Sequence, residues 1–204
     1  MAEEIAGNES EEVRSTLDPE IEARRRAALA RVRVFGDPAL RTRAAPVEKF
    51  DGALAAEIAR MTRLMEDALG VGLAATQLGV MHRVLVYRAG PDAPFVAVVN
   101  PELEWASTEQ ETAEEACLSI PGVAVDVERP LYVRVNARAE DGKPILIEAS
   151  GLDARVVQHE MDHLDGVLIL DRTSKEQRKE ALRTLREGGS RWPAPNEALE
   201  PSPA

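Results

Sequence analysis

The sequence contains few cysteine, histidine and aromatic residues. Its 204 residues include one cysteine, three histidines and 3% aromatic residues. A single cysteine excludes an internal disulfide and fits a reducing compartment. Scarce aromatics leave the core to Val, Leu, Ile and Ala, but a chain of this length can still bury a sizeable core.

Excess positive charge and long apolar runs are also missing. The net charge is −11 at pH 7, and because phosphate contacts need a basic surface, we do not expect DNA binding. No apolar run approaches the ~20 residues that cross a bilayer, and the N-terminus is acidic where a signal peptide is basic. We therefore expect a cytoplasmic protein that binds neither DNA nor a membrane.

Two of the three histidines stand in the pattern H-E-x-x-H, at His159 and His163. On an α-helix, a spacing of four residues puts the two imidazoles about 40° apart on one face, so both can bind one metal ion. Glu160 lies a quarter-turn away, near the ion but free to carry protons. The pattern alone leaves open a core helix whose polar residues satisfy one another.

A catalytic metal site needs a third protein ligand and an open position. His82 precedes the apolar run at 84–87, which favours the edge of a strand over a metal site. Cys117 is the other soft candidate. A lone cysteine is usually a small buried apolar residue, but this one stands where an acidic run gives way to a Pro-Gly turn. Cysteine with two histidines would form a divalent site suited to activating water.

Three segments resemble motifs of the peptide deformylases. Residues 70–77 (GVGLAATQ) resemble G-x-G-x-A-A-x-Q, residues 115–119 (EACLS) resemble E-G-C-L-S, and residues 158–166 match Q-H-E-x-D-H-L-x-G. They occur in the family's order, within a resemblance that covers roughly residues 30–172. Ala116 stands where the family usually has glycine, and its methyl group could crowd a substrate backbone.

The resemblance implies a hydrolase that removes the N-formyl group from the initiator methionine of new polypeptides and releases formate. Its metal ligands would be Cys117, His159 and His163. Fe²⁺ would be the native ion, although Zn²⁺, Ni²⁺ or Co²⁺ would also suit these ligands. The resemblance further implies that the amide of Gln77 and the backbone N–H of Leu118 stabilise the oxyanion, with Glu160 as the proton carrier.

The resemblance also implies a substrate site. Its residues lie in the first motif, directly before the cysteine and on the metal helix: Val71, Gly72, Ala116, Leu152 and Val156. The same matching pairs Glu115 with Arg129 as support for the cysteine loop. An exposed charge at the start of a strand is the alternative for Arg129.

Two other functions stay open. A metallopeptidase shares H-E-x-x-H but usually takes a third ligand downstream, where Glu176 and Glu180 are candidates because no histidine follows His163. A catalytically inactive relative would keep the metal as a structural or binding element. Loss of Glu160 or Gln77 would indicate such a relative, and both residues are present.

The expected fold is α+β, with antiparallel strands packed around the central H-E-x-x-H helix and further helices at both ends. Residues 1–29 are expected to form an acidic, partly disordered extension with a short helix. Residues 30–172 would be the catalytic domain, and residues 173–204 a helix followed by a proline-rich flexible tail. Asp18 and Asp51 are predicted helix N-caps.

Strands are predicted at 84–87, 95–99, around 105–112, and at 123–127, 131–137 and 145–147, with a hairpin turn at Asp141-Gly142. The helix expected over 174–187 carries a basic stripe within an arc of about 140°, made of Lys175, Arg178, Lys179, Arg183 and Arg186. Such a stripe would attract ribosomal RNA, which makes the ribosome a candidate partner. A solvated charged face is an equal alternative.

Overall fold

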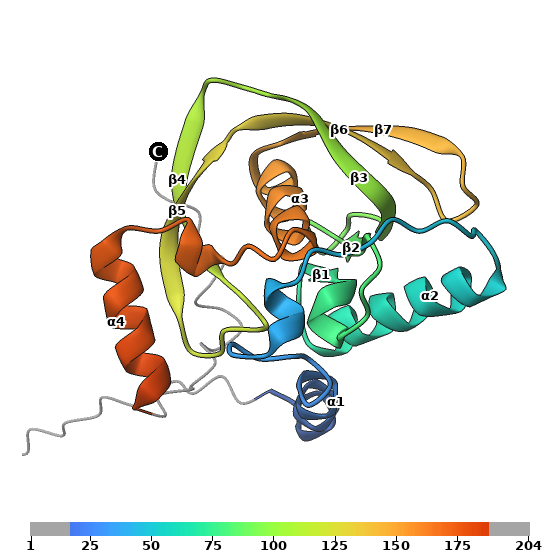
Figure 1. The fold of residues 1–204 in the computed structure, drawn as a ribbon. Coiled ribbons are helices and arrows are strands. Elements are labelled where there is room, and N and C mark those ends of the chain that lie inside the picture. Colours follow the sequence, from blue (N-terminus) through green and yellow to red (C-terminus); the bar gives the residue numbers. More distant parts are fainter. Residues whose placement is uncertain (1–16, 188–204) are drawn as a thin grey trace, which may run out of the picture.

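Two antiparallel sheets frame the molecule in the computed structural model, which describes residues 17–187. The larger sheet has the strand order β1-β2-β3-β6-β7, and β4 and β5 form a separate two-stranded ribbon (Figure 1). The bounds are β1 Gly72–Ala74, β2 Val84–Tyr87, β3 Val96–Ala106, β4 Gln110–Ala116, β5 Ala124–Pro130, β6 Tyr132–Arg138 and β7 Pro144–Ser150.

The H-E-x-x-H segment lies on α3 (Gly151–Leu164), which is enclosed by both sheets (Figure 1). Its buried side includes Val157 and Leu164, which pack in one cluster with Val133 and Val135 of β6. The other helices lie outside the sheets: α1 Pro19–Leu29, α2 Gly52–Asp67 and α4 Lys175–Arg186. The predicted α+β arrangement around a central helix is confirmed.

The predicted helix starts are confirmed by their capping bonds. Asp18 accepts a hydrogen bond from the N–H of Glu20 at 2.8 Å, and Asp51 accepts one from Ala53 at 2.9 Å. A capping carboxylate satisfies N–H groups that have no partner in the first turn. The inner face of α2 is apolar and fully buried, at Leu54, Ile58, Met61 and Met65.

The strand predictions differ from the structure in one region. Residues 95–99 and Trp105 belong mostly to one long strand, β3, whereas the segment expected around 105–112 is divided by a turn before β4. Ser107 stabilises this turn by donating a hydrogen bond to the carbonyl of Glu109 at 2.8 Å. Register shifts against β6 interrupt the alternation along β3, so its pattern does not read as one strand.

Three short 3₁₀ helices were not expected: η1 Pro38–Arg41, η2 Ala75–Leu78 and η3 Ile169–Asp171. The hairpin turn at Asp141-Gly142 is present, with Gly142 at φ +82°.

Within residues 17–187, no helix combines the length and apolar character needed to cross a membrane. The disorder expected in the N-terminal extension falls almost wholly on residues before 17, which lie outside the described residues, as does the proline-rich tail from 188 onward.

Candidate active site

The two histidines of α3 lie beside the only cysteine of the chain. Cys117 follows the end of β4, and its Sγ is 3.1 Å from Nε2 of His163. One ligand atom from each of Cys117, His159 and His163 lies within 4.8 Å of the others, and no other such group of three occurs in residues 17–187. The cysteine proposed from the sequence therefore reaches the histidine pair.

His82, the third histidine, does not join this group. Its side chain is half exposed and its Nδ1 is 2.9 Å from the carboxylate of Glu57. It forms an isolated β-bridge with Ala45 just before β2, so the strand-edge interpretation is confirmed. Glu176 and Glu180, the candidates for the third ligand of a metallopeptidase, lie on α4 outside the Cys–His–His group.

The ring of His159 is oriented by a buried carboxylate. Its Nδ1 is 2.9 Å from Oε2 of Glu115, and because a carboxylate can only accept, this nitrogen carries the proton. The other nitrogen, Nε2, is left to bind a metal, as is usual for histidine ligands supported by a carboxylate. Burial lowers the pKa of His163, and the positive charge of Arg129 lowers it further. His163 therefore stays neutral, as a metal ligand must.

Glu115 is itself held by Arg129, as the resemblance implies. Arg129 is 4% exposed and donates to both oxygens of Glu115, at 2.6 and 2.9 Å. Burial alone would raise the pKa of Glu115, but hydrogen bonds with Arg129 and His159 hold this pKa well below its usual range. The alternative interpretation of Arg129, an exposed charge, is wrong because the side chain closes a buried ion pair.

Glu160 occupies a dry position beside the three ligands. It is 4% exposed, and burial raises its pKa to about 7. Its Oε2 has no hydrogen-bond partner within the described chain. A carboxylate whose pKa lies near neutrality can accept and return a proton at physiological pH. Gly72 makes this position possible, because a Cβ there would lie 2.3 Å from Oε1 of Glu160.

Two possible oxyanion donors lie next to Cys117. The carbonyl oxygen of the Gln77 amide accepts the N–H of Ala74 at 2.8 Å, which turns Nε2 towards Ser119 Oγ at 3.2 Å and Cys117 Sγ at 3.8 Å. The backbone N–H of Leu118 makes no hydrogen bond within residues 17–187. The N–H of Leu118 is therefore free to donate, and the Gln77 amide can donate to a new partner in place of the long contact with Cys117.

The loops of the first two motifs are packed together and tied to the N-terminal part of the domain. A Cβ on Gly70 would lie 3.0 Å from Cδ1 of Leu118. The backbone N–H of Arg33 donates to the backbone carbonyl of Gln77 at 2.7 Å, and the backbone N–H of Phe35 donates to that of Ser119 at 2.8 Å. The segment before η1 thus holds the two loops that carry the donors, a role that its sequence did not indicate.

The residues expected to bind substrate divide into two groups. Val71, Ala116 and Leu152 are exposed, with Val71 at 39% and Leu152 at 46%. Val156 and Gly72 are buried, Val156 within the core and Gly72 against Glu160. Only the first group can contact a substrate without a rearrangement.

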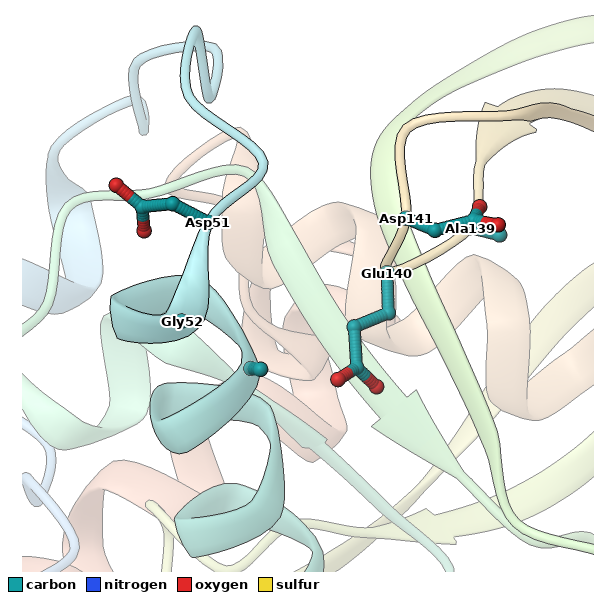
Figure 2. A pocket seen from close by; sticks show the side chains of 6 residues that line it. Asp51, Gly52, Ala139, Glu140 and Asp141 are labelled. Carbon is teal, nitrogen blue, oxygen red and sulfur yellow. The ribbon is translucent and has the colours of Figure 1, made fainter.

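A hollow of about 400 Å³ lies elsewhere, between the start of α2 and the β6–β7 turn (Figure 2). None of its lining residues belongs to the Cys–His–His group. Its acidic groups serve the fold: Asp51 caps α2, and Asp141 binds Lys143. The metal-binding chemistry therefore lies outside this hollow.

The residues at the Cys–His–His group fit a catalytic metal ion. Thiolate and imidazole are ligands for Zn²⁺ and Fe²⁺, and three protein ligands leave a position for water. Glu160 is close to this position without being needed as a ligand, and its unpartnered oxygen points to a missing polar neighbour. Sites with these features occur in metal-dependent hydrolases.

Comparison with known proteins narrows this class. The family model described as polypeptide deformylase matches residues 29–179. A peptide deformylase of Acidothermus cellulolyticus is 45% identical over 176 residues, which cover 86% of this chain and 95% of that protein. One from Thermotoga neapolitana is 51% identical over 148 residues, covering 72% and 89%. The chain belongs to the polypeptide deformylase family.

Solved structures agree with this assignment. The crystal structure of peptide deformylase from Thermotoga maritima matches with a TM-score of 0.68 and 49% identity, covering 71% of this chain and 97% of that one. The enzyme from Synechococcus elongatus in complex with actinonin gives a TM-score of 0.72 and 39% identity, with coverages of 83% and 91%. The chain is thus a metal-dependent hydrolase that removes the formyl group from the N-terminal formylmethionine of nascent polypeptides.

Proposed function

We propose that this hydrolysis takes place at Cys117, His159 and His163, which hold one divalent ion, with Fe²⁺ as the native metal. The observation that carries the proposal is the approach of the three ligand atoms to within 4.8 Å of one another. When bound, the ion supplies a Lewis acid and a water of lowered pKa. Because cysteine with two histidines also suits Zn²⁺, the choice of Fe²⁺ follows from the family resemblance.

In this proposal Glu160 moves the proton. Its unpartnered Oε2 takes the proton from the attacking water and passes it to the leaving nitrogen of methionine. The amide of Gln77 and the N–H of Leu118 donate hydrogen bonds to the oxygen of the formyl group as it becomes negative. Their closeness to Cys117 supports this role, because the oxyanion forms beside the ligands.

The peptide would lie along β1. This strand is at one edge of the larger sheet, so an extended substrate can add to it by backbone hydrogen bonds. The exposed Val71, Ala116 and Leu152 are the nearest candidates for contact, with Val156 and Gly72 behind them. Ala116 replaces the family's glycine at an exposed position, so its methyl group would meet the substrate and not the metal.

The experiment that tests this function is deformylation of formyl-Met-Ala-Ser by anaerobically purified protein, with metal content measured on the same sample. Stoichiometric formate and free Met-Ala-Ser are expected. Cleavage between the amino acids would indicate a peptidase. Metal binding without any product would indicate an inactive relative.

We further propose that α4 docks on the ribosome and that the protein is cytoplasmic, with residues 30–172 as the catalytic segment between extensions 1–29 and 173–204. Ala181 is buried in an apolar cluster that includes Val125 and Val127 of β5, and Leu182 and Leu185 pack against this cluster. These contacts leave the opposite face of α4 to solvent.

The charges on this face support the docking. Arg178 is used within the fold, binding Asp171, and Arg183 pairs with Glu180. Lys175, Lys179 and Arg186 are exposed and form no ion pair within residues 17–187. An unpaired basic face on an acidic protein is what the phosphates of ribosomal RNA would attract.

The test changes Lys175, Lys179 and Arg186 to Glu and compares co-sedimentation with ribosomes. The matched control changes three exposed arginines on or next to α1 to Glu: Arg24, Arg26 and Arg31. Binding should fall only in the α4 variant, most visibly at low salt, with turnover of a short formyl peptide unchanged in both. Equal losses of binding in both variants would mean that only net charge matters.

A further inference from the structure

The buried carboxylate of Glu115 is held by a second arginine that the motifs do not include. Oε1 of Glu115 accepts hydrogen bonds from Nε of Arg129 at 2.6 Å and from NH1 of Arg155 at 2.8 Å. Arg155 is 8% exposed and lies four residues before His159 on α3. Residues four apart lie on the same helix face, so Arg155 and His159 contact Glu115 side by side.

Arg155 also binds the backbone of both strands of the ribbon. Its NH1 donates to the carbonyl of Val127 on β5 at 2.9 Å, and its NH2 donates to the carbonyl of Glu111 on β4 at 2.8 Å. One planar guanidinium thus connects three acceptors to α3. An ammonium group cannot reproduce this arrangement, because a point charge lacks the rigid fork.

The position of the ribbon determines where Cys117 lies. β4 ends at Ala116, directly before the cysteine, and the ribbon is not hydrogen-bonded into the larger sheet. The histidine ligands are on α3, so the distance from Cys117 to His159 and His163 depends on how β4 is held against this helix. Arg155 makes this connection to β4 at Glu111 and Glu115, beside the ion pair of 2.9 Å between Arg129 of β5 and Asp162 of α3.

We propose that Arg155 is a positioning residue of the metal site, which keeps Cys117 and His159 at ligand spacing by fixing β4 and Glu115 against α3. The inference rests on the proposed metal site. It implies that loss of the Arg155 fork weakens metal binding and turnover. Because Arg155 is buried and its guanidinium donates to Glu115, Val127 and Glu111 and to none of the exposed substrate candidates, KM should change little.

The test compares Arg155→Met and Arg155→Lys with the wild type, each loaded with Co²⁺. Methionine fills similar space but makes none of the three hydrogen bonds, whereas lysine keeps the charge without the fork. Three quantities are measured: the rate of cobalt transfer to a chelator, the thiolate-to-cobalt absorption, and kcat with KM. Arg134→Met is the matched control, because Arg134 binds Glu148 on the outer sheet surface, where it is 42% exposed.

Arg155→Met is expected to weaken cobalt binding about 10–100-fold, the usual cost of losing a group that supports a metal ligand. Its thiolate absorption should weaken and kcat should fall, with KM within about twofold of wild type. Arg155→Lys should give intermediate values, and Arg134→Met should behave as wild type.

A purely structural role predicts a different result. It would lower the melting temperature of Arg155→Met while cobalt release and the thiolate absorption stayed as in wild type, and this outcome would overturn the proposal. If Arg155→Met does not fold, unchanged cobalt release in Arg155→Lys overturns it as well. A wild type that binds cobalt through Cys117 but releases no formate would instead refute the proposed function, and the measurements of cobalt release would still decide the role of Arg155.

Discussion

At the scale of single residues, burial assigns different tasks to neighbouring groups of the H-E-x-x-H segment. His163 is kept neutral for metal binding, whereas Glu160 has a pKa raised to about 7 by desolvation. Both groups lie within one turn of α3 and share the neighbouring charges of Arg129 and Glu115, but burial disfavours the charged form of each, which is the cation of His163 and the anion of Glu160. His163 is therefore suited to binding a metal, and Glu160 to carrying a proton.

Glu160→Gln should retain the metal but lose turnover. Glutamine has the same shape and fills the space beside Gly72, but it cannot accept the proton, so kcat should fall by about 10²–10⁴. Metal content and formate release are measured on the same preparation. Loss of the metal together with the activity would show that Glu160 is a ligand.

Gly72→Ala should displace the carboxylate without removing it. The added Cβ would lie 2.3 Å from Oε1 of Glu160, which must therefore move. Displacement of a catalytic group by about 1 Å can reduce the rate by ~10². Gly52→Ala is the control, because a Cβ at this exposed position of α2 meets nothing within 4 Å. Equal kcat values in both variants would contradict the role assigned to Gly72.

Cys117 should make the iron-loaded enzyme sensitive to oxygen. A thiolate and Fe²⁺ would share a site that must admit water, and both are oxidised by dioxygen or peroxide. Activity and free-thiol content are followed during aeration of iron-loaded and zinc-loaded samples. The iron sample should lose activity first, and stable activity in a zinc-free iron sample would refute the prediction.

The sequence indicated the residues that perform chemistry better than those that support them. His159, Glu160 and His163 stand in a short pattern whose spacing has a direct geometric meaning, and Cys117 stands in a motif that resembles one of the family's. Arg155 and the segment from Arg33 to Phe35 support the site through contacts between parts of the chain far apart in sequence. Such contacts leave no local pattern in the sequence, because an arginine is ordinarily predicted to be a solvent-exposed charge.

At the scale of elements, the carboxylate of Asp171 connects three helical elements: η1, η3 and the C-terminal helix α4. Asp171 in η3 binds Arg41 of η1 and Arg178 of α4, and it accepts the N–H of Leu168 at 2.9 Å. Burial would raise the pKa of Asp171, but the hydrogen bond from Arg41 is the main cause that holds it below the usual value. The ionised form is therefore favoured in the folded protein.

The stability contributed by Asp171 should depend on pH. A lowered folded-state pKa means that the contribution is complete above the unfolded pKa of about 4 and is lost as the pH falls through the folded pKa. Wild type should be more stable than Asp171→Asn at pH 7, and the difference should shrink below about pH 4. Urea unfolding at several pH values measures it, with the exposed Asp92→Asn as control. A constant difference would contradict the assignment.

Element boundaries followed the sequence wherever a cap or a regular alternation marked them. Asp18 and Asp51 begin their helices as expected, and β5 and β6 alternate between buried and exposed residues. The predicted strand boundaries were wrong at β3. Two register shifts against β6 interrupt the alternation of buried and exposed side chains there, and Trp105 is half exposed. A bulge is decided by the partner strand, so one strand's pattern cannot reveal it.

At the scale of the whole molecule, the site lies where the β4–β5 ribbon meets the central helix, a contact that Arg155 and Arg129 also hold. Cys117 extends from the β4–β5 ribbon, and the two histidines belong to α3, which also packs against the larger sheet. A bound metal would therefore cross-link the ribbon to the central helix. Because the unfolded chain does not hold the three ligands together, metal binding should stabilise the folded state.

Metal removal should accordingly lower the melting temperature. At a free metal concentration of 100 times Kd, binding adds about 2.7 kcal/mol, which for a chain of this size corresponds to roughly 5–10 °C. Thermal unfolding is followed at increasing free Zn²⁺, with Cys117→Ser as the control that keeps the fold but lacks the thiolate. The wild-type melting temperature should rise with the logarithm of free metal, and the variant should respond far less. Identical curves for both proteins would mean that Cys117 is not a ligand, however close it lies to His163.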